Sequence, residues 1–272
     1  MLHYEFMRIA FITALLLGLS LPLIGSGAVY KRLSGSGDAL AHSSLAGVAI
    51  GLVSGLHPLL VSIVTCVVAF LIIELLRKKF SKYAEIGVVV VLAAAIGLVG
   101  ILSTCAKTSN FDSYLFGSII LLSNTELIAA IALTAVVVLF ALLLYPQLFA
   151  AFYSSDEAKV AKIPVGILNF FHSLLLAVSV AIGAKIVGSL VVSSMIVLPT
   201  AIALLWKRSY RFTMVLSVVV SVAAMLGGLT ISYYLDWPPG ATIALLSVAI
   251  LFLALGVRGA ITLSCRLKKS KR

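Results

Sequence analysis

Runs of about 20 apolar residues, the length of an α-helix that crosses a bilayer, repeat along almost the whole chain. Short polar turns separate the runs. The pattern predicts an all-α, polytopic membrane protein with eight to nine transmembrane helices. The expected helices are Phe6–Ile24, Ala39–Leu56, Leu59–Leu76, Glu85–Leu102, Glu126–Tyr145, Ile167–Ile182, Ile186–Trp206, Phe212–Leu235 and Ala241–Leu263.

Several connections between these runs are short. His57-Pro58 predicts a tight turn, because proline keeps the preceding residue out of the α region. Ile167–Trp206 is barely long enough for two passes, so we expect either a very tight turn at Gly183-Ala184-Lys185 or one long broken helix. The segment Phe111–Leu122 is too short for a separate span and is expected to be a short or re-entrant helix packed inside the protein.

Clusters of lysine and arginine lie between the runs, and an even number of spans separates each cluster from the next. The positive-inside rule therefore places these clusters in the cytoplasm. Lys31-Arg32 joins the same side if the N-terminus is outside, and the first run is read as a membrane helix rather than a cleaved signal. The clusters are Arg77-Lys78-Lys79 with Lys82, Lys159 with Lys162, Lys207-Arg208 with Arg211, and Arg266 to Arg272.

The composition agrees with an integral membrane protein. Hydrophobic residues make up 62% of the 272 residues and charged residues 11%, whereas soluble domains carry about 25% charged residues. The formal net charge of +11 does not indicate a nucleic-acid partner, because the cations lie at the ends of apolar runs. The three cysteines, Cys66, Cys105 and Cys265, are far apart and have no metal-ligand or disulfide spacing.

The most unusual stretch is Tyr30–Gly51, where an apolar helix carries Asp38 and His42. These residues are four apart, so their side chains lie on one helix face, one turn apart. An ionisable group near the membrane centre costs roughly 2.5–3.5 kcal/mol. The pair therefore indicates an ion or substrate site, although Asp38 as a first-turn acid and His42 hydrogen-bonded to the backbone would also fit the spacing.

Four other ionisable residues near the helices have simpler interpretations. Glu74 is expected to pair with Arg77 or Lys78 on its own helix. Glu126 reads as a first-turn acid, His172 as a structural residue, and Lys185 as a lysine that snorkels from the outer turn. None of them forms a candidate site to rival Asp38 and His42.

The longest polar stretch is Ser154–Val165, SSDEAKVAKIPV. Serine, two acids and then lysines match the cap and macrodipole preferences of a short helix, which Pro164 would end. The stretch is either a solvated connector or a cytoplasmic helix that docks a partner. The residues that would form the docking surface are Ser155, Asp156, Glu157, Ala158, Lys159 and Val160.

No enzymatic motif is present in the sequence. The chain has no HExxH, GxSxG or paired-aspartate motif, and it has no P-loop GxxxxGK[ST]. It cannot bind and hydrolyse ATP through a Walker site of its own. Primary active transport would require a separate ATPase subunit, and no bound cofactor is expected.

Five segments in the same order and spacing resemble the membrane permease subunit of metal-ion ABC importers, the group that serves zinc, manganese and iron. One departure is Ala46, where that family often has proline. The segments are GDALAH (Gly37–His42) with Gly47 and Gly51, YLFGS (Tyr114–Ser118), SSDEAKVAKIPV, VGSLVVSSMIVLPTAIA (Val187–Ala203) and GGLTISYYLDWPPGAT (Gly227–Thr242).

The resemblance implies a single permease domain over residues 1–272 in the cytoplasmic (inner) cell membrane, with a cytoplasmic coupling loop at about 147–166 that docks on an ATPase. It implies a second permease subunit, two ATPase subunits and an extracytoplasmic metal-binding protein. It also makes Asp38 and His42 metal-contacting residues, with the metal as transported substrate. The coupling role falls on the SSDEAKVAKIPV segment.

One carboxylate and one imidazole are too few ligands for a divalent ion, and a two-fold axis beside this helix would double them. Such a nitrogen and oxygen site suits zinc, manganese or iron(II) without choosing among them. Three alternatives stay open. They are a permease for a metal chelate such as a siderophore or cobalamin, a membrane enzyme that acts on lipid, and a passive channel.

Overall fold

The computed structural model describes residues 5–31, 33–80, 85–105, 124–153 and 155–270, and within these ranges every regular element is an α-helix. The all-α prediction is confirmed. The segment Phe111–Leu122 lies outside the described residues. The helices are α1 (Glu5–Tyr30), α2 (Gly35–Ser54), α3 (Pro58–Lys79), α4 (Glu85–Cys105), α6 (Asn124–Leu143), α7 (Tyr145–Tyr153), α8 (Ser155–Val160), α9 (Val165–Val187), α10 (Ser189–Leu204), α11 (Tyr210–Leu235) and α12 (Pro239–Ser270).

Among the described residues, 7 helices are long and apolar enough to cross a membrane: α1, α3, α4, α6, α9, α11 and α12. The helix α10 is apolar but shorter, and α2 is diluted by serine, glycine and its ionisable pair. The predicted count of eight to nine spans is therefore not confirmed by length and composition. The helices nevertheless make a multi-pass membrane protein.

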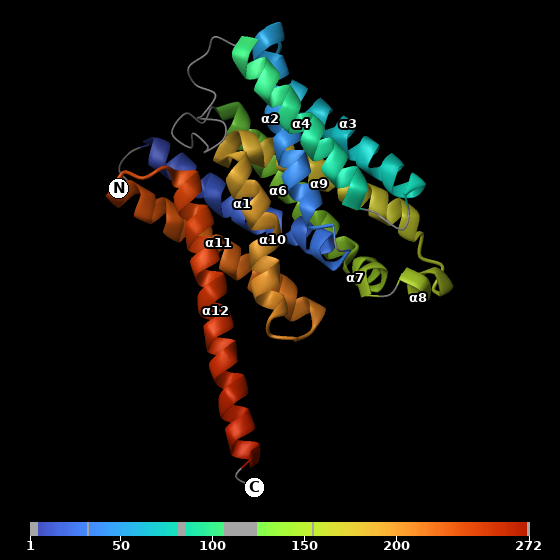
Figure 1. Ribbon diagram of the computed structural model, residues 1–272, viewed down its shortest axis with the longest axis vertical. Helices are drawn as coiled ribbons and strands as arrows, with labels where there is room; N and C mark the ends of the chain where they lie inside the picture. Colours follow the sequence, from blue (N-terminus) through green and yellow to red (C-terminus); the bar gives the residue numbers. More distant parts are fainter. Residues whose placement is uncertain (1–4, 32, 81–84, 106–123, 154, 271–272) are drawn as a thin grey trace.

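The helix α2 lies inside the bundle, between α3 and α4 on one side and α9 and α10 on the other (Figure 1). Its close contact with α3 includes a hydrogen bond between the hydroxyls of Ser44 and Ser62, 2.8 Å apart. From residue 36 to residue 51, the only described residues of α2 that are not buried are Asp38, His42 and Ile50. Asp38 and His42 therefore lie on the one face of α2 that neighbouring helices leave partly exposed.

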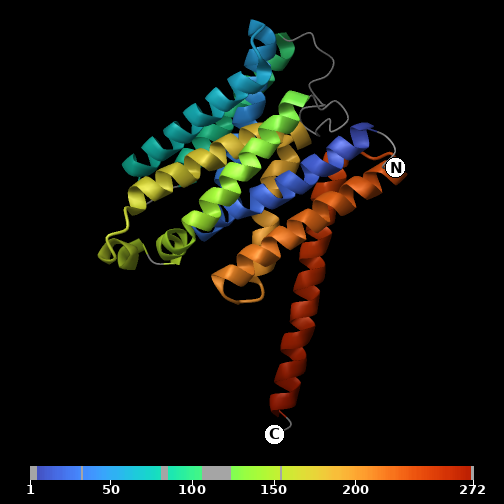
Figure 2. The ribbon, with the colours of Figure 1, turned by 180° about the vertical axis from the view of Figure 1, so that it is seen from behind.

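The cation-rich helix ends gather on one side of the bundle. The end of α3, the short helices α7 and α8, and the turn between α10 and α11 lie toward the lower and right-hand side of Figure 1, while the α2–α3 turn lies at the top. Figure 2 shows the same separation from behind, with the second half of α12 extending away from the bundle. This arrangement is the one that the spacing of the cation clusters predicts.

The reversal between α9 and α10 lies a few residues later than predicted. The helix α9 continues through Lys185 to Val187, and the chain turns at Gly188 with φ 100° and ψ 150°. A residue with a side chain rarely adopts this φ, so glycine sets the position of the turn. The predicted turn at Gly183-Ala184-Lys185 was wrong because Gly183 serves packing instead, against Val192 of α10.

The predicted tight turn at His57-Pro58 is confirmed, with Pro58 at the first position of α3. At the other end of the bundle, the helix predicted to end at Tyr145 ends at Leu143 in the structure. The chain then re-enters a helix, α7, whose second residue is Pro146. Proline is tolerated there because the first helical N–H groups have no partner within the helix.

Candidate functional site

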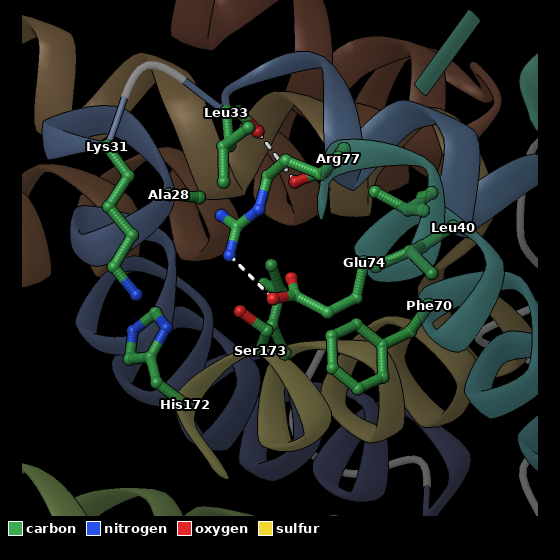
Figure 3. Close-up of a pocket in the computed structure, with 12 residues that line it drawn as sticks. Ala28, Lys31, Leu33, Leu40, Phe70, Glu74, Arg77, His172 and Ser173 are labelled. Carbon is green, nitrogen blue, oxygen red and sulfur yellow. Dashed lines mark hydrogen bonds and ion pairs between the residues drawn. The ribbon is translucent and has the colours of Figure 1, made fainter. Parts of the chain in front are cut away.

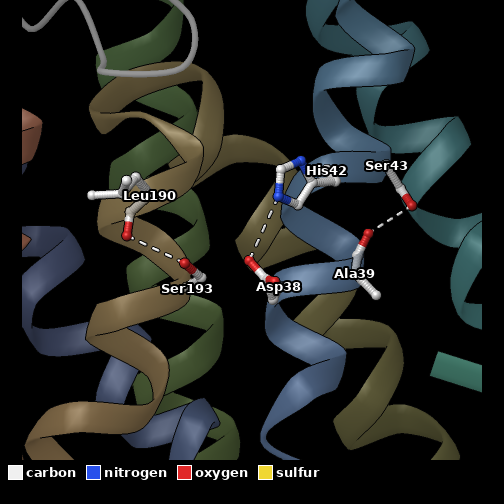
Figure 4. Close-up of polar contacts among 6 residues, drawn as sticks. All are labelled: Asp38, Ala39, His42, Ser43, Leu190 and Ser193. Carbon is white, nitrogen blue, oxygen red and sulfur yellow. Dashed lines mark hydrogen bonds and ion pairs between the residues drawn. The ribbon is translucent and has the colours of Figure 1, made fainter. Parts of the chain in front are cut away.

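The candidate site begins where α2 begins. The Ser36 hydroxyl donates a 2.6 Å hydrogen bond to the Leu33 carbonyl just before the helix proper. Asp38 then occupies the first turn, where the helix dipole favours a carboxylate. His42 follows one turn later, with its Nε2 3.8 Å from Asp38 Oδ1 (Figure 4). This separation is within ion-pair range but is longer than a hydrogen bond. Each side chain therefore keeps lone pairs that can bind a metal ion.

Both side chains point away from α2 toward α10. The side chains of Asp38 and His42 are 50% and 29% exposed, on a helix that is otherwise almost entirely buried. Asp38 lines an open groove of about 640 Å³ between α2, α10 and α12, whose other walls include Ser193, Ser194 and Val248. Figure 4 shows the pair facing this gap from α2, with Ser193 on the opposite helix.

The arrangement offers a carboxylate oxygen and an imidazole nitrogen side by side, a donor set suited to first-row transition metals. No group of three or more His, Cys, Asp or Glu side chains that could hold a metal ion occurs within the described ranges. The pair therefore gives half of an ordinary four-ligand site. The missing half is therefore not supplied by the residues that the structure describes.

The segment predicted to dock a partner forms the short helix α8, Ser155–Val160, on the cation-rich side. Ala158 is buried and packs with Leu148 and Val165, while Glu157 and Val160 are exposed. The side chains of Ser155, Asp156 and Lys159 lie outside what the structure describes, so the predicted serine cap stays a prediction. The helix thus rests on α7 and α9 through one small residue and presents its other described side chains to solvent.

Ion pairs also lie elsewhere among the described helices. The predicted pair within α3 is confirmed, with Arg77 Nη2 2.7 Å from Glu74 Oε1. A second pair was missed, in which Lys185 Nζ of α9 lies 2.7 Å from Glu126 Oε1 of α6, with both side chains mostly buried. The available signal was the topology, which placed both residues at outer helix ends.

The sequence also gave no sign of a second polar cluster, at the end of α1 (Figure 3). Lys31 Nζ and His172 Nε2 are both buried and lack a hydrogen-bond partner within the described part of the chain. They line a small cavity of about 20 Å³ together with Glu74, Arg77 and Ser173. Lys31 follows the first apolar span, and its burial, with a further contribution from Arg77, lowers its pKa from 10.5 to about 7 against the opposing effect of Glu74.

A bundle of apolar helices with an ionisable pair facing an open groove is the architecture of a multi-pass membrane protein. The sequence pattern of the ABC 3 transport family matches residues 3–258, and the chain belongs to this family. The resemblance inferred from the five sequence segments is thereby confirmed.

Relatives cover almost the full length of the chain. A probable metal transport system membrane protein of Treponema pallidum is 35% identical over 94% of this chain and 97% of its own. The high-affinity zinc uptake system membrane protein ZnuB of Haemophilus influenzae is 26% identical, with 93% and 97% covered. The manganese transport system membrane protein MntC of Listeria monocytogenes is 27% identical, with 93% and 91% covered.

A solved structure described as PsaBC from Streptococcus pneumoniae in complex with Fab has a similar fold. Its TM-score is 0.82 at 25% sequence identity, and the match covers 92% of this chain and 91% of that chain. The helices described above therefore follow the arrangement of the helices in that solved structure.

Proposed function

We propose that this chain is the permease subunit of an ATP-driven ABC importer that carries a divalent transition metal ion, such as zinc, manganese or iron. The proposal rests mainly on the outward-facing Asp38 and His42 of α2. Their side chains are the partly exposed ionisable groups on an otherwise buried helix, and Asp38 lines an open groove. The metal transport named for the relatives supports the same class of substrate.

A second permease subunit, identical or closely related, completes the proposed site. A two-fold axis along the groove would bring two carboxylates and two imidazoles together. Four such ligands suit a divalent first-row metal. The site need not bind tightly, because an ion in transit must also be released. The metal is the transported substrate, and we assign the chain neither a catalytic role nor a bound cofactor.

The remaining parts follow from the same proposal. We take residues 1–272 as one permease domain, in which α2 and α10 join the apolar helices and bring the crossing helices to eight or nine. The segment at about 147–166, which contains α7 and α8, is the coupling loop for a cytoplasmic ATPase. An extracytoplasmic binding protein delivers the ion at the opposite side.

Uptake of radiolabelled zinc, manganese and iron tests the site. Vesicles contain wild type, Asp38→Asn or His42→Ala, each with its ATPase present. Because each substitution removes a metal ligand on both sides of the axis, we expect uptake of the preferred metal to fall at least about tenfold, the scale of losses at metal sites. Undiminished uptake of all three metals in both variants would remove the site assignment.

The same vesicles separate the competing functions. A chelate permease would keep transport of its chelate in Asp38→Ala and would show no uptake of the free ion. A passive channel would continue uptake when ATP or the ATPase is withdrawn. The importer proposed here would lose uptake of the free metal ion in Asp38→Ala, and it would also lose this uptake when ATP or the ATPase is withdrawn.

Co-purification tests the coupling loop. Replacing Asp156 and Glu157 by lysine reverses the charge at the start of α8, and we expect it to weaken association with the ATPase. The double substitution of Lys78 and Lys79 by glutamate at the end of α3 is the matched control. Unchanged co-purification and unchanged ATP turnover in the Asp156 and Glu157 variant would contradict docking at α8.

A further inference from the structure

The end of α1 meets α7 and α9 at one point. Lys31 Nζ lies 4.8 Å from the centre of the Phe152 ring of α7. That ring in turn meets the imidazole of His172, on α9, edge to face at 5.2 Å between centroids. Gly27, one turn before Lys31, leaves no room for a side chain, because a Cβ there would collide with the His172 ring and lie 2.6 Å from Phe152 Cζ. The three helices are therefore in direct contact at this junction.

Lys31 is a poor choice of residue if it serves stability alone. Its ammonium group is buried without a hydrogen-bond partner in the described ranges, and the burial that lowers its pKa to about 7 measures how strongly the site disfavours a charge. The neighbouring charges are Glu74 and Arg77, which already pair with each other. An apolar residue would fit this position at lower cost. Proteins keep a costly buried charge of this kind most often at functional positions.

Phe152 links α8 to the rest of the bundle. It packs against the small cluster of Leu148, Ala158 and Val165, which contains the buried residue of α8. It also packs against the cluster of Ala141, Tyr210 and Met214, which joins α6 and α11. Close-packed interiors transmit displacement rather than absorb it. A shift of α8 is therefore expected to displace the Phe152 side chain.

The segment that connects Lys31 to the candidate ion site is short, and backbone hydrogen bonds hold it. The Leu33 N–H donates a 2.8 Å hydrogen bond to the Ala28 carbonyl, and the Ser36 N–H donates a 3.0 Å hydrogen bond to the Leu33 carbonyl. These bonds fasten the end of α1 to the start of α2. Asp38 lies in the first turn of α2. These two hydrogen bonds therefore connect the end of α1 to the turn of α2 that carries Asp38.

We propose that Lys31 is a positioning residue that holds the end of α1 against Phe152, so that a displacement of α7 and α8 is passed to the first turn of α2. This inference rests on the proposed function, in which α8 receives the motion of the ATPase and Asp38 contacts the ion. It adds the particular side-chain contact through which the two are linked.

The test measures metal transported per ATP hydrolysed at about pH 6, where Lys31 is charged because its pKa is about 7. It uses the full permease and ATPase complex in proteoliposomes. Lys31→Met keeps the length of the side chain and removes the cation. We expect this ratio to fall severalfold while ATP hydrolysis continues, and Lys31→Arg to restore much of it, because arginine keeps the cation over the ring. Lys79→Met makes the same chemical change at an exposed position at the end of α3 and should keep the wild-type ratio.

A double-variant cycle locates the contact. Phe152→Leu alone should lower the ratio, and Phe152→Leu combined with Lys31→Met should lower it no further, since both remove one interaction. A fully additive loss would overturn the link between the two side chains.

Thermal unfolding of the same proteins separates positioning from simple structural support. Lys31→Met removes a buried charge, so we expect it to unfold at a temperature no lower than wild type. A wild-type transport ratio in Lys31→Met, or a loss of transport that merely follows a loss of stability, overturns the inference. Failure of the proposed function looks different, because the wild-type complex itself would then show no ATP-dependent uptake of any of the three metals.

Discussion

Two pairs of ionisable side chains lie near the start of α2, and they differ in what can reach them. The side chains of Asp38 and His42 are 50% and 29% exposed, and Asp38 lines an open groove. Lys31 and His172 are turned inward, and their terminal nitrogens are buried around a cavity of only about 20 Å³. A cavity of that size holds about one water molecule. The first pair is therefore accessible to an ion from outside the chain, and the second only to the protein's own helices.

The contrast shows that a charge inside a membrane protein can serve two different purposes. A half-exposed pair on an internal helix retains its solvent and is available as a ligand. A buried cation without a hydrogen-bond partner lowers stability, so its presence indicates that the contact it makes, here with the Phe152 ring, is needed for function. Substitutions of Asp38 or His42 should therefore change metal transport and leave the unfolding free energy nearly unchanged. Substitutions of Lys31 or His172 should change both quantities.

The largest expected effect comes from removing the outward pair while keeping its shape. Asp38→Asn combined with His42→Gln should reduce metal uptake at least about tenfold. The unfolding free energy should stay within about 0.5 kcal/mol of wild type, as for exposed positions. Uptake in vesicles and thermal unfolding in detergent measure the two quantities. A strongly destabilised double variant would mean that the pair is structural.

The pH dependence of stability distinguishes the inward pair. Between about pH 7 and 10.5 the unfolded chain keeps a proton on Lys31 that the folded chain has released. Stability therefore rises with pH across this window, by an amount on the order of 5 kcal/mol. Below pH 7 both states are protonated and the burial penalty is present in full. Lys31→Met should lack this rise when unfolding is followed at several pH values, and an identical profile for both proteins would contradict the burial of the charge.

Packing around the inward pair can be tested without changing charge. Gly27→Ala places a methyl group against His172 and Phe152, and overpacking of this kind costs roughly 1–3 kcal/mol. Gly97→Ala is the matched control, since nothing lies within 4 Å of its added Cβ and alanine favours a helix by about 0.5–1 kcal/mol. Thermal unfolding should therefore shift in opposite directions. Equal shifts would show that the junction is loosely packed.

The smallest effect concerns the charges around Lys31. Arg77 lowers and Glu74 raises the pKa of Lys31. Arg77→Gln should therefore move the beginning of the stability rise to higher pH, and Glu74→Gln should move it to lower pH. The loss of their partly exposed pair should itself cost less than about 1 kcal/mol. Shifts in the same direction for both variants would show that these groups do not act through their charges.

The sequence allowed the helices and the outward pair to be predicted because both depend on local spacing. Apolar runs define spans, and a four-residue interval places Asp38 and His42 on one face whatever packs around them. The pairing of Lys185 with Glu126 and the contact of Lys31 with Phe152 join distant segments, so helix packing alone decides them. The turn at Gly188 was misplaced because Gly183 and Gly188 stand five residues apart, and only packing shows at which of them the chain turns.

The central claim is that the outward pair of one subunit faces the same pair of another across a symmetry axis. Cross-linking of single cysteines tests this most directly, in a background where Cys66, Cys105 and Cys265 are replaced by serine. With a short bifunctional thiol reagent, His42→Cys should yield covalent permease dimers. Val64→Cys, at a position 60% exposed on α3, should yield none. Failure of the cysteine at position 42 to cross-link in the assembled importer, or equal linking at position 64, would contradict the shared site.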